Sequence, residues 1–268
     1  MKIELFNLEK GSEGKVDLPV QFNELISPSL IRRAVVAFQL NKRQHYGANP
    51  EAGTRVSAKV SRRRRNYRGS YGKGISRVPR KVLSRRGSQF FWQGALAPGT
   101  VKGRRAHPPK AYQTWFKKIN KKENSKAIRS SLAASMEAGF VKGRGHNLPE
   151  DYPFAVNDSF ASLDKTKLVK QTLEKLGFKP ELSRTTKKTL RAGRGKARGR
   201  KYSRKTGLLI VVSDKCPLQK SAANIPGTDV VLAEQLNAEL LAPGAVPGRL
   251  TLFTASAINK IKSDKLFM

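Results

Sequence analysis

Two long stretches of this sequence carry so much positive charge that neither can fold as an ordinary globular segment. Residues 44–110 contain 17 Lys or Arg and one acid, Glu51, and residues 179–205 contain 12 Lys or Arg and one acid, Glu181. Together they hold 29 of the 54 basic residues in the chain. Because like charges at this density repel one another in a compact state, we expect a polyanion to neutralise them.

Nucleic acid is the polyanion that fits this charge best. The formal net charge of the 268-residue chain is +35, and each phosphate contact releases a counterion. A membrane surface is the alternative, but the sequence has no run of about 18 apolar residues and no recognisable signal peptide. The single Cys216 excludes an internal disulfide and is typical of a reducing compartment. We therefore expect a cytoplasmic protein with no membrane partner.

Outside the basic stretches the hydrophobic pattern is that of a globular α/β domain. Strands are predicted at residues 2–7, 16–20, 154–156, 208–212, 229–232 and 250–253. Helices are predicted at residues 28–43, 111–119, 125–136, 166–176, 235–241 and 256–261. The last three strands are continuous apolar runs that alternate with helices, which favours a mostly parallel sheet with helices on both faces. We predict that residues 1–43 and 111–268 form this domain, and that an extended basic loop, residues 44–110, is inserted after its first helix.

The inserted loop shows no helical or strand period. Gly, Ser, Arg and Pro dominate it, and a structureless loop of this length is usually functional or disordered. Yet it also carries Tyr46, Tyr67, Tyr71 and the run Phe90 to Trp92. Aromatic side chains spaced among arginines can stack on bases or fill crevices in RNA. The alternative for Phe90 to Trp92 is that they pack on the body of the protein.

The run RAGRGKARGRK at residues 191–201 has a basic residue at every second or third position, with Gly or Ala between. Small residues let a backbone approach phosphates closely, and arginine forks bind phosphates bidentately. The run is suited to lining an RNA groove. A disordered basic linker is the alternative.

Sites for catalysis, cofactors or metals are not recognisable. Gly193, Gly195 and Gly199 lack the spacing of a dinucleotide-binding fingerprint, and no Walker-type phosphate loop is present. Cys216 has no neighbouring His, and the few acids offer no candidate pair for acid–base chemistry. The three histidines are too scattered for a metal site: His45, His107 and His146. We predict a non-enzymatic protein with no cofactor of its own, and that any Mg²⁺ is held by the bound RNA.

Several short blocks of the sequence resemble the archaeal and eukaryotic form of the large-subunit ribosomal protein four family. The matching blocks occur in order along nearly the whole chain, and their number makes the resemblance specific. They are NKRQHY at 41–46, AG at 52–53, RVPR at 77–80, AHPPK at 106–110, RSSLAAS at 129–135, RGH at 144–146, the run at 191–201, NIPG at 224–227, LAPG at 241–244 and TASA at 254–257.

The resemblance implies a structural constituent of the large ribosomal subunit that binds large-subunit ribosomal RNA and acts early in assembly. It implies an α/β body on the particle surface beside other ribosomal proteins. It also implies a long loop whose tip, residues 62–80 by position, helps to line the peptide exit tunnel near the nascent peptide. The tip differs from the family pattern in being more basic at residues 62–65.

From local charge and aromatic spacing we predict a set of RNA-binding residues. It comprises Lys42, Arg43, Arg55, Lys59, Arg62, Arg63, Arg64, Arg65, Tyr67, Arg68, Tyr71, Lys73, Arg77, Arg80, Arg85, Arg86, Trp92, Arg104, Arg105, Lys110, Arg144, Arg191, Arg194, Lys196, Arg198, Arg200 and Lys201. Two other functions compete with a ribosomal one. A general RNA chaperone or nucleic-acid-packaging protein would bind DNA and RNA alike, and an enzyme acting on RNA would need a nucleotide pocket at the strand ends.

Overall fold

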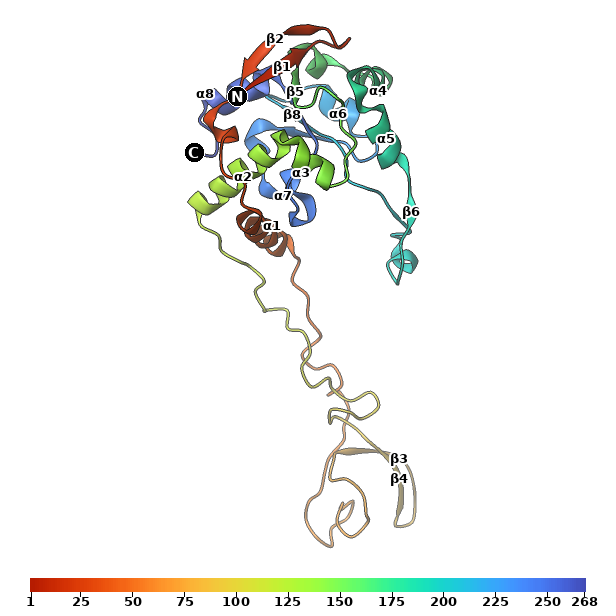
Figure 1. Ribbon diagram of the computed structural model, residues 1–268. Helices are drawn as coiled ribbons and strands as arrows, with labels where there is room; N and C mark the ends of the chain where they lie inside the picture. Colours follow the sequence, from red (N-terminus) through yellow and green to blue (C-terminus); the bar gives the residue numbers. More distant parts are fainter. The chain divides into compact units, whose positions relative to one another are not determined.

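The computed structural model describes residues 1–268 and divides into two compact units (Figure 1). The first, here called the body, comprises Met1–Lys42 and Phe116–Met268. The second, here called the loop unit, comprises Arg43–Trp115. None of the helices combines the length and the apolar composition that crossing a membrane requires.

A six-stranded sheet forms the centre of the body, in the order β2-β1-β5-β10-β8-β9. The strands are β1 (Lys2–Phe6), β2 (Ser12–Asp17), β5 (Phe154–Val156), β8 (Leu209–Val212), β9 (Asp229–Leu232) and β10 (Thr251–Thr254). Only the β1–β2 pair is antiparallel, and the other four pairs are parallel. The sheet is therefore mostly parallel, as the apolar runs indicated.

Helices cover both faces of this sheet. Successive side chains of a strand point to opposite faces, so β8 contributes Leu209 and Val211 to one apolar core and Ile210 and Val212 to the other. The first core also contains residues of α1 (Pro28–Lys42), α2 (Lys121–Met136), α7 (Ala238–Leu241) and α8 (Ala255–Ser263). The second contains residues of α3 (Ala138–Gly143), α4 (Thr166–Leu173), α5 (Lys179–Thr186) and α6 (Leu218–Ala222). The predicted fold class is confirmed.

Three sequence predictions for the body were wrong at the level of single elements. The second strand is β2, not residues 16–20, because the Asn7 side chain accepts hydrogen bonds from the Glu9 and Gly11 amides and turns the chain earlier. Residues 235–241 form a helix only from Ala238. Residues 111–119 are not helical, because the Asn41 side chain accepts from the Lys117 amide and donates to the Lys117 carbonyl. The short helices α3, α5 and α6 were not predicted.

The loop unit contains a hairpin that the sequence analysis missed. Strands β3 (Arg80–Arg86) and β4 (Gln89–Gly94) pair antiparallel through the two-residue turn Gly87-Ser88, where Gly87 has φ +57°. A positive φ at the first turn position is the conformation that favours Gly, and Gly-Ser between two strands is a recognised hairpin signal. The signal was present in the sequence but was obscured by the surrounding charge.

One arginine is part of the body's interior. Arg249 is 1% exposed, and its guanidinium donates to the carbonyls of Gly207 (2.9 Å) and Leu240 (3.0 Å) and is ion-paired with Asp229. These bonds tie the segments before β8 and β10 to α7 and β9. Burial lowers the pKa of Arg249, and the hydrogen bond and charge of Asp229 oppose that shift.

We expect Arg249→Met to destabilise the body strongly, because the Gly207 and Leu240 carbonyls lose their buried donor. Each unsatisfied buried group costs about 1–3 kcal/mol, so the free energy of unfolding should fall by about 2–5 kcal/mol. Chemical denaturation of the full chain measures this. The control Arg32→Met removes an exposed arginine of α1 and should change stability little; equal losses in both variants would contradict the structural role of Arg249.

Candidate nucleic-acid interface

The cations of both basic stretches lack carboxylate partners almost entirely. In residues 44–110 only Arg55 forms an ion pair, with Glu51 at 3.5 Å, and in residues 179–205 only Arg184 does, with Glu181. Elsewhere in the body, ion pairs use most of the available acids, as in Lys260 with Asp214 and Glu234. The unpaired charge is therefore concentrated in the two stretches identified from the sequence.

The predicted RNA-binding residues fall into two groups and one outlier. The first group lies in the loop unit together with Lys42 at the end of α1, and the second lies in residues 191–201 of the body. The basic side chains of both groups are exposed, except that of Arg80, which is half-buried. The aromatic side chains of Tyr71 and Trp92 are also half-buried. The outlier is Arg144, whose half-buried guanidinium donates to the carbonyls of Pro243 and Val246.

The aromatic residues of the loop unit pack on one another. The Tyr67 ring meets the Phe90 ring edge-on at a centroid distance of 5.3 Å, and Phe90 stacks on Trp92 at 5.2 Å. Four cations, Arg68, Lys73, Arg80 and Arg85, lie within 6.0 Å of these rings. Phe90 therefore contacts both Tyr67 and Trp92 within the loop unit, and these rings lie next to the surrounding cations.

A second cation–aromatic contact joins the two ends of the loop unit. The Arg43 guanidinium lies 3.9 Å from the centroid of the Trp115 indole, and the Tyr46 ring stacks near Trp115 at 6.2 Å. Trp115 was assigned to a helix by the sequence analysis, so this contact was missed. The sequence did contain a signal against a helix at Trp115, because this residue follows Pro108-Pro109 closely and no helical run precedes it.

The two arms of the loop unit run close together. The Ala48 amide donates to the Pro109 carbonyl at 2.9 Å. A Cβ atom at Gly47 would lie 2.3 Å from the Ala111 nitrogen, and one at Gly53 would lie 2.5 Å from the Arg104 nitrogen. Only glycine permits these backbone approaches.

The loop unit has almost no interior of its own. Its only fully buried side chains are Ala58, Ser70 and Ala95. Two buried alanines supply far less apolar area than is needed to order more than 70 residues, because each residue fixed costs about 1–2 kcal/mol of backbone entropy. The shape of the loop unit must therefore be stabilised from outside.

The second basic stretch ends in a small exposed hairpin. Strands β6 (Thr189–Leu190) and β7 (Tyr202–Ser203) pair antiparallel, and the Arg191 amide donates to the Lys201 carbonyl at 2.9 Å. Gly199, with φ +79°, helps to close the turn. Every basic residue between the strands is exposed, so the hairpin presents its charge outward.

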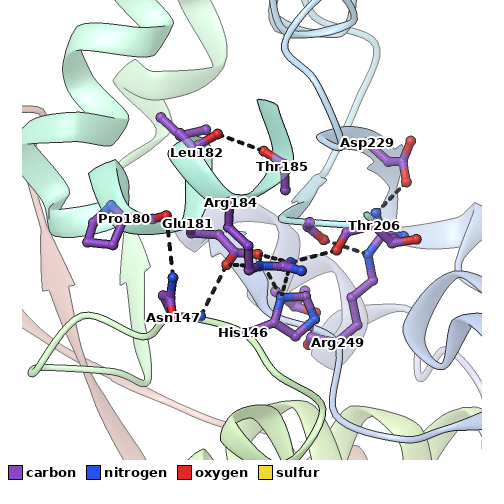
Figure 2. Close-up of polar contacts among 12 residues, drawn as sticks. His146, Asn147, Pro180, Glu181, Leu182, Arg184, Thr185, Thr206, Asp229 and Arg249 are labelled. Carbon is purple, nitrogen blue, oxygen red and sulfur yellow. Dashed lines mark hydrogen bonds and ion pairs between the residues drawn. The ribbon is translucent and has the colours of Figure 1, made fainter. Parts of the chain in front are cut away.

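A buried polar cluster fixes the base of this second hairpin (Figure 2). Glu181 of α5 is fully buried and accepts hydrogen bonds from His146 Nδ1 (2.7 Å), the Asn147 amide (3.1 Å) and Arg184. Arg184 also donates to the Thr206 carbonyl at 2.7 Å, which ties α5 to the chain that returns from the hairpin. The one acid of the second basic stretch is therefore a structural anchor.

The hydrogen bonds at Glu181 also set its protonation. Burial by itself would raise the pKa of this carboxyl, but the hydrogen bonds from Arg184, His146 and the Asn147 amide outweigh it and lower the pKa to about 2. The carboxylate is thus charged in the folded protein at neutral pH.

We expect the stability that Glu181 contributes to be fully present above pH 4.5, its ordinary pKa, and to disappear as the pH falls towards 2. At pH 7, Glu181→Gln should lower the free energy of unfolding by about 3–5 kcal/mol, because Arg184 loses its partner. The gap between wild type and variant should narrow on acidification in denaturation curves. Glu150→Gln, at an exposed unpaired acid, is the control; a pH-independent gap would contradict this account of Glu181.

No group of three His, Cys, Asp or Glu side chains in residues 1–268 is arranged to hold a metal ion. Trp115 Nε1 and Arg80 Nε, in the loop unit, are buried and have no hydrogen-bond acceptor. The arrangement as a whole offers fixed, unpaired cations next to aromatic rings on an extended backbone. Its chemistry is that of binding phosphates and bases.

Comparisons with known proteins agree with this geometry. The model of the ribosomal protein L4/L1 family matches residues 16–264. The chain is 48% identical to the large ribosomal subunit protein uL4 of Nanoarchaeum equitans over 268 residues, which cover 100% of both chains. It is 40% identical to the protein of the same name from Halobacterium salinarum, over 97% of this chain and 99% of that one. It is also 40% identical to that of Methanocaldococcus jannaschii, over 98% of each chain. The resemblance found in the sequence blocks is confirmed, and the chain belongs to the ribosomal protein L4/L1 family.

Proposed function

We propose that this protein binds large-subunit ribosomal RNA through the loop unit and the 191–201 hairpin, and that the RNA orders the loop unit during subunit assembly. As a member of its family the chain is a structural constituent of the large ribosomal subunit, located in the ribosome of the cytoplasm, and is not an enzyme. Its partners are accordingly ribosomal RNA and other ribosomal proteins.

One observation carries the proposal: the loop unit combines many unpaired cations with almost no apolar interior. Such a segment has to gain its stability from charge neutralisation, and RNA phosphates supply it at regular spacing. The exposed arginines contact phosphates, while the glycines allow the two arms to pass together between RNA helices. Any Mg²⁺ in the interface is held by the RNA.

The length of the loop unit supports a place inside the particle for its tip. Each arm of a hairpin made from residues 44–110 has about 33 residues and can span at most about 110 Å when fully extended. We propose that the tip, residues 62–80, helps to line the peptide exit tunnel and meets the nascent peptide, as the family resemblance implies. Arg77, whose guanidinium lies 4.4 Å from the Tyr71 ring centroid, is a fixed cation of that tip.

We expect replacement of Arg62, Arg63, Arg64 and Arg65 by Gln to weaken binding to large-subunit ribosomal RNA at least about 100-fold at moderate salt. Affinity falls as salt rises, and loss of four phosphate contacts should reduce the magnitude of the slope of log affinity against log salt by about 3. Filter binding at several salt concentrations measures both, and sucrose-gradient sedimentation measures incorporation into large subunits.

The matched control replaces four exposed, unpaired lysines of the body, Lys15, Lys215, Lys220 and Lys262, by Gln. It lowers the net charge equally and should retain most of the affinity. Wild-type binding and incorporation by the arginine variant would contradict the proposal. Equal affinity of the wild type for duplex DNA and ribosomal RNA would favour a general RNA chaperone or packaging protein instead.

A further inference from the structure

Two adjoining hollows on the body lie between α4, α5 and the turn that precedes β9. The first has a volume of about 460 Å³ and is lined by residues of both helices and by Asn224, Ile225 and Pro226. The second, of about 400 Å³, extends along α5. Lys170, Leu182 and Thr186 line both, so the two form one groove. In Figure 1, α5 lies below α4, and the chain runs from α5 down to the β6 strand of the second hairpin.

The groove has an apolar floor and a basic rim. Leu182 and Ile225, 7% and 9% exposed, form the floor together with Pro226. Lys167, Lys170, Lys179 and Lys187 form the rim, and the one lining carboxylate, Glu174, is paired with Lys170 at 3.8 Å. The other three rim lysines have no acidic partner, so the groove is suited to a ligand that is flat or apolar in one part and anionic in another.

Asn224 is the residue of this groove that the fold does not use. In the same turn, Ile225 belongs to the second core of the body. Gly227 has φ +77°, and a Cβ atom there would lie 2.9 Å from the Lys205 carbonyl oxygen. The Asn224 side chain, in contrast, is exposed and makes no hydrogen bond within the protein. Its amide presents a donor and an acceptor together to the groove.

We propose that this groove holds an unpaired nucleotide of the bound RNA, with its base against the apolar floor and its phosphates at the lysine rim. Recognition of RNA sequence mostly targets such splayed-out bases, which are read through their hydrogen-bonding edges. An amide such as that of Asn224 can donate to and accept from one base edge at the same time. This inference rests on the proposed function, since it assumes an RNA ligand.

The charge of the rim favours RNA over a protein partner. A protein surface that covered this groove would have to bring acidic groups to Lys167, Lys179 and Lys187, whereas a nucleotide carries its anion next to its flat base. Lys187 also lies directly between the end of α5 and the second hairpin. A strand bound to residues 191–201 therefore needs to continue by only a short distance to reach the groove.

A photo-crosslinking experiment tests the occupant directly. Asn224 is replaced by p-benzoylphenylalanine in the full chain, which is then assembled into large subunits and irradiated. We expect a crosslink to ribosomal RNA that maps, by primer extension, to one unpaired nucleotide. The same replacement at the exposed Asn23, which follows Phe22 of the first core and does not line the groove, is the position control. A crosslink from position 224 to another ribosomal protein would overturn the proposal.

Affinity for purified large-subunit ribosomal RNA gives a second, independent readout. Asn224→Ala should weaken binding about three- to tenfold without changing the salt slope, because it removes a neutral hydrogen bond. The double change Lys167→Gln and Lys187→Gln should reduce the magnitude of the slope of log affinity against log salt by about 1.5, since two phosphate contacts are lost. Asn23→Ala, and Lys15→Gln with Lys262→Gln, are the matched controls.

The outcomes separate this inference from the proposed function. If the groove variants bind like the wild type while the four-arginine loop variant loses affinity, the RNA function stands and the nucleotide groove is wrong. If the loop variant also binds like the wild type, the proposed function itself is wrong. Loss of affinity in the groove variants with wild-type thermal stability supports the groove as a nucleotide site.

Discussion

Repulsion among cations that have no carboxylate partner is the constraint on which this structure depends. The body pairs most of its acidic residues with neighbouring Lys or Arg residues. It folds around two apolar cores on the two faces of its sheet. The loop unit has one ion pair and two buried alanines. The body therefore gains its stability from burial of apolar surface, and in the proposed function the loop unit gains its stability from an external polyanion.

The body does more than carry the loop, because its buried polar groups position the second basic hairpin. Glu181 binds His146 and Arg184 at the base of that hairpin, and Arg249 fixes the strand starts nearby. Both arrangements place charged groups in the interior, where they are stabilised only by complete hydrogen bonding. The result is that cations needed at the surface project from a rigid base, so less entropy is lost when RNA binds them.

The sequence was sufficient to predict the elements whose pattern is local. The apolar run of β8 and the helical spacing of Ile31, Ala34 and Val35 in α1 are such patterns, and both elements lie where they were expected. The charge distribution likewise indicated where unpaired cations gather. Other features depend on contacts between distant residues. Tyr67 packs on Phe90, Arg43 stacks on Trp115, and the Asn41 side chain keeps Lys117 out of a helix. The hydrophobic period of a single segment contains no information on such pairs. For the same reason Arg144 was grouped with the RNA-binding residues, although it donates to two carbonyls of the body.

Amide hydrogen exchange of the loop unit, measured in the isolated chain and in assembled large subunits, tests the central claim most directly. We expect the backbone amides of Arg43–Trp115 to exchange within seconds in the RNA-free protein, apart from brief protection in the β3–β4 hairpin, and to become strongly protected in the particle. The strands of the body should be protected in both. Strong protection throughout the loop unit of the RNA-free protein would show that it folds without phosphates, and would contradict the account.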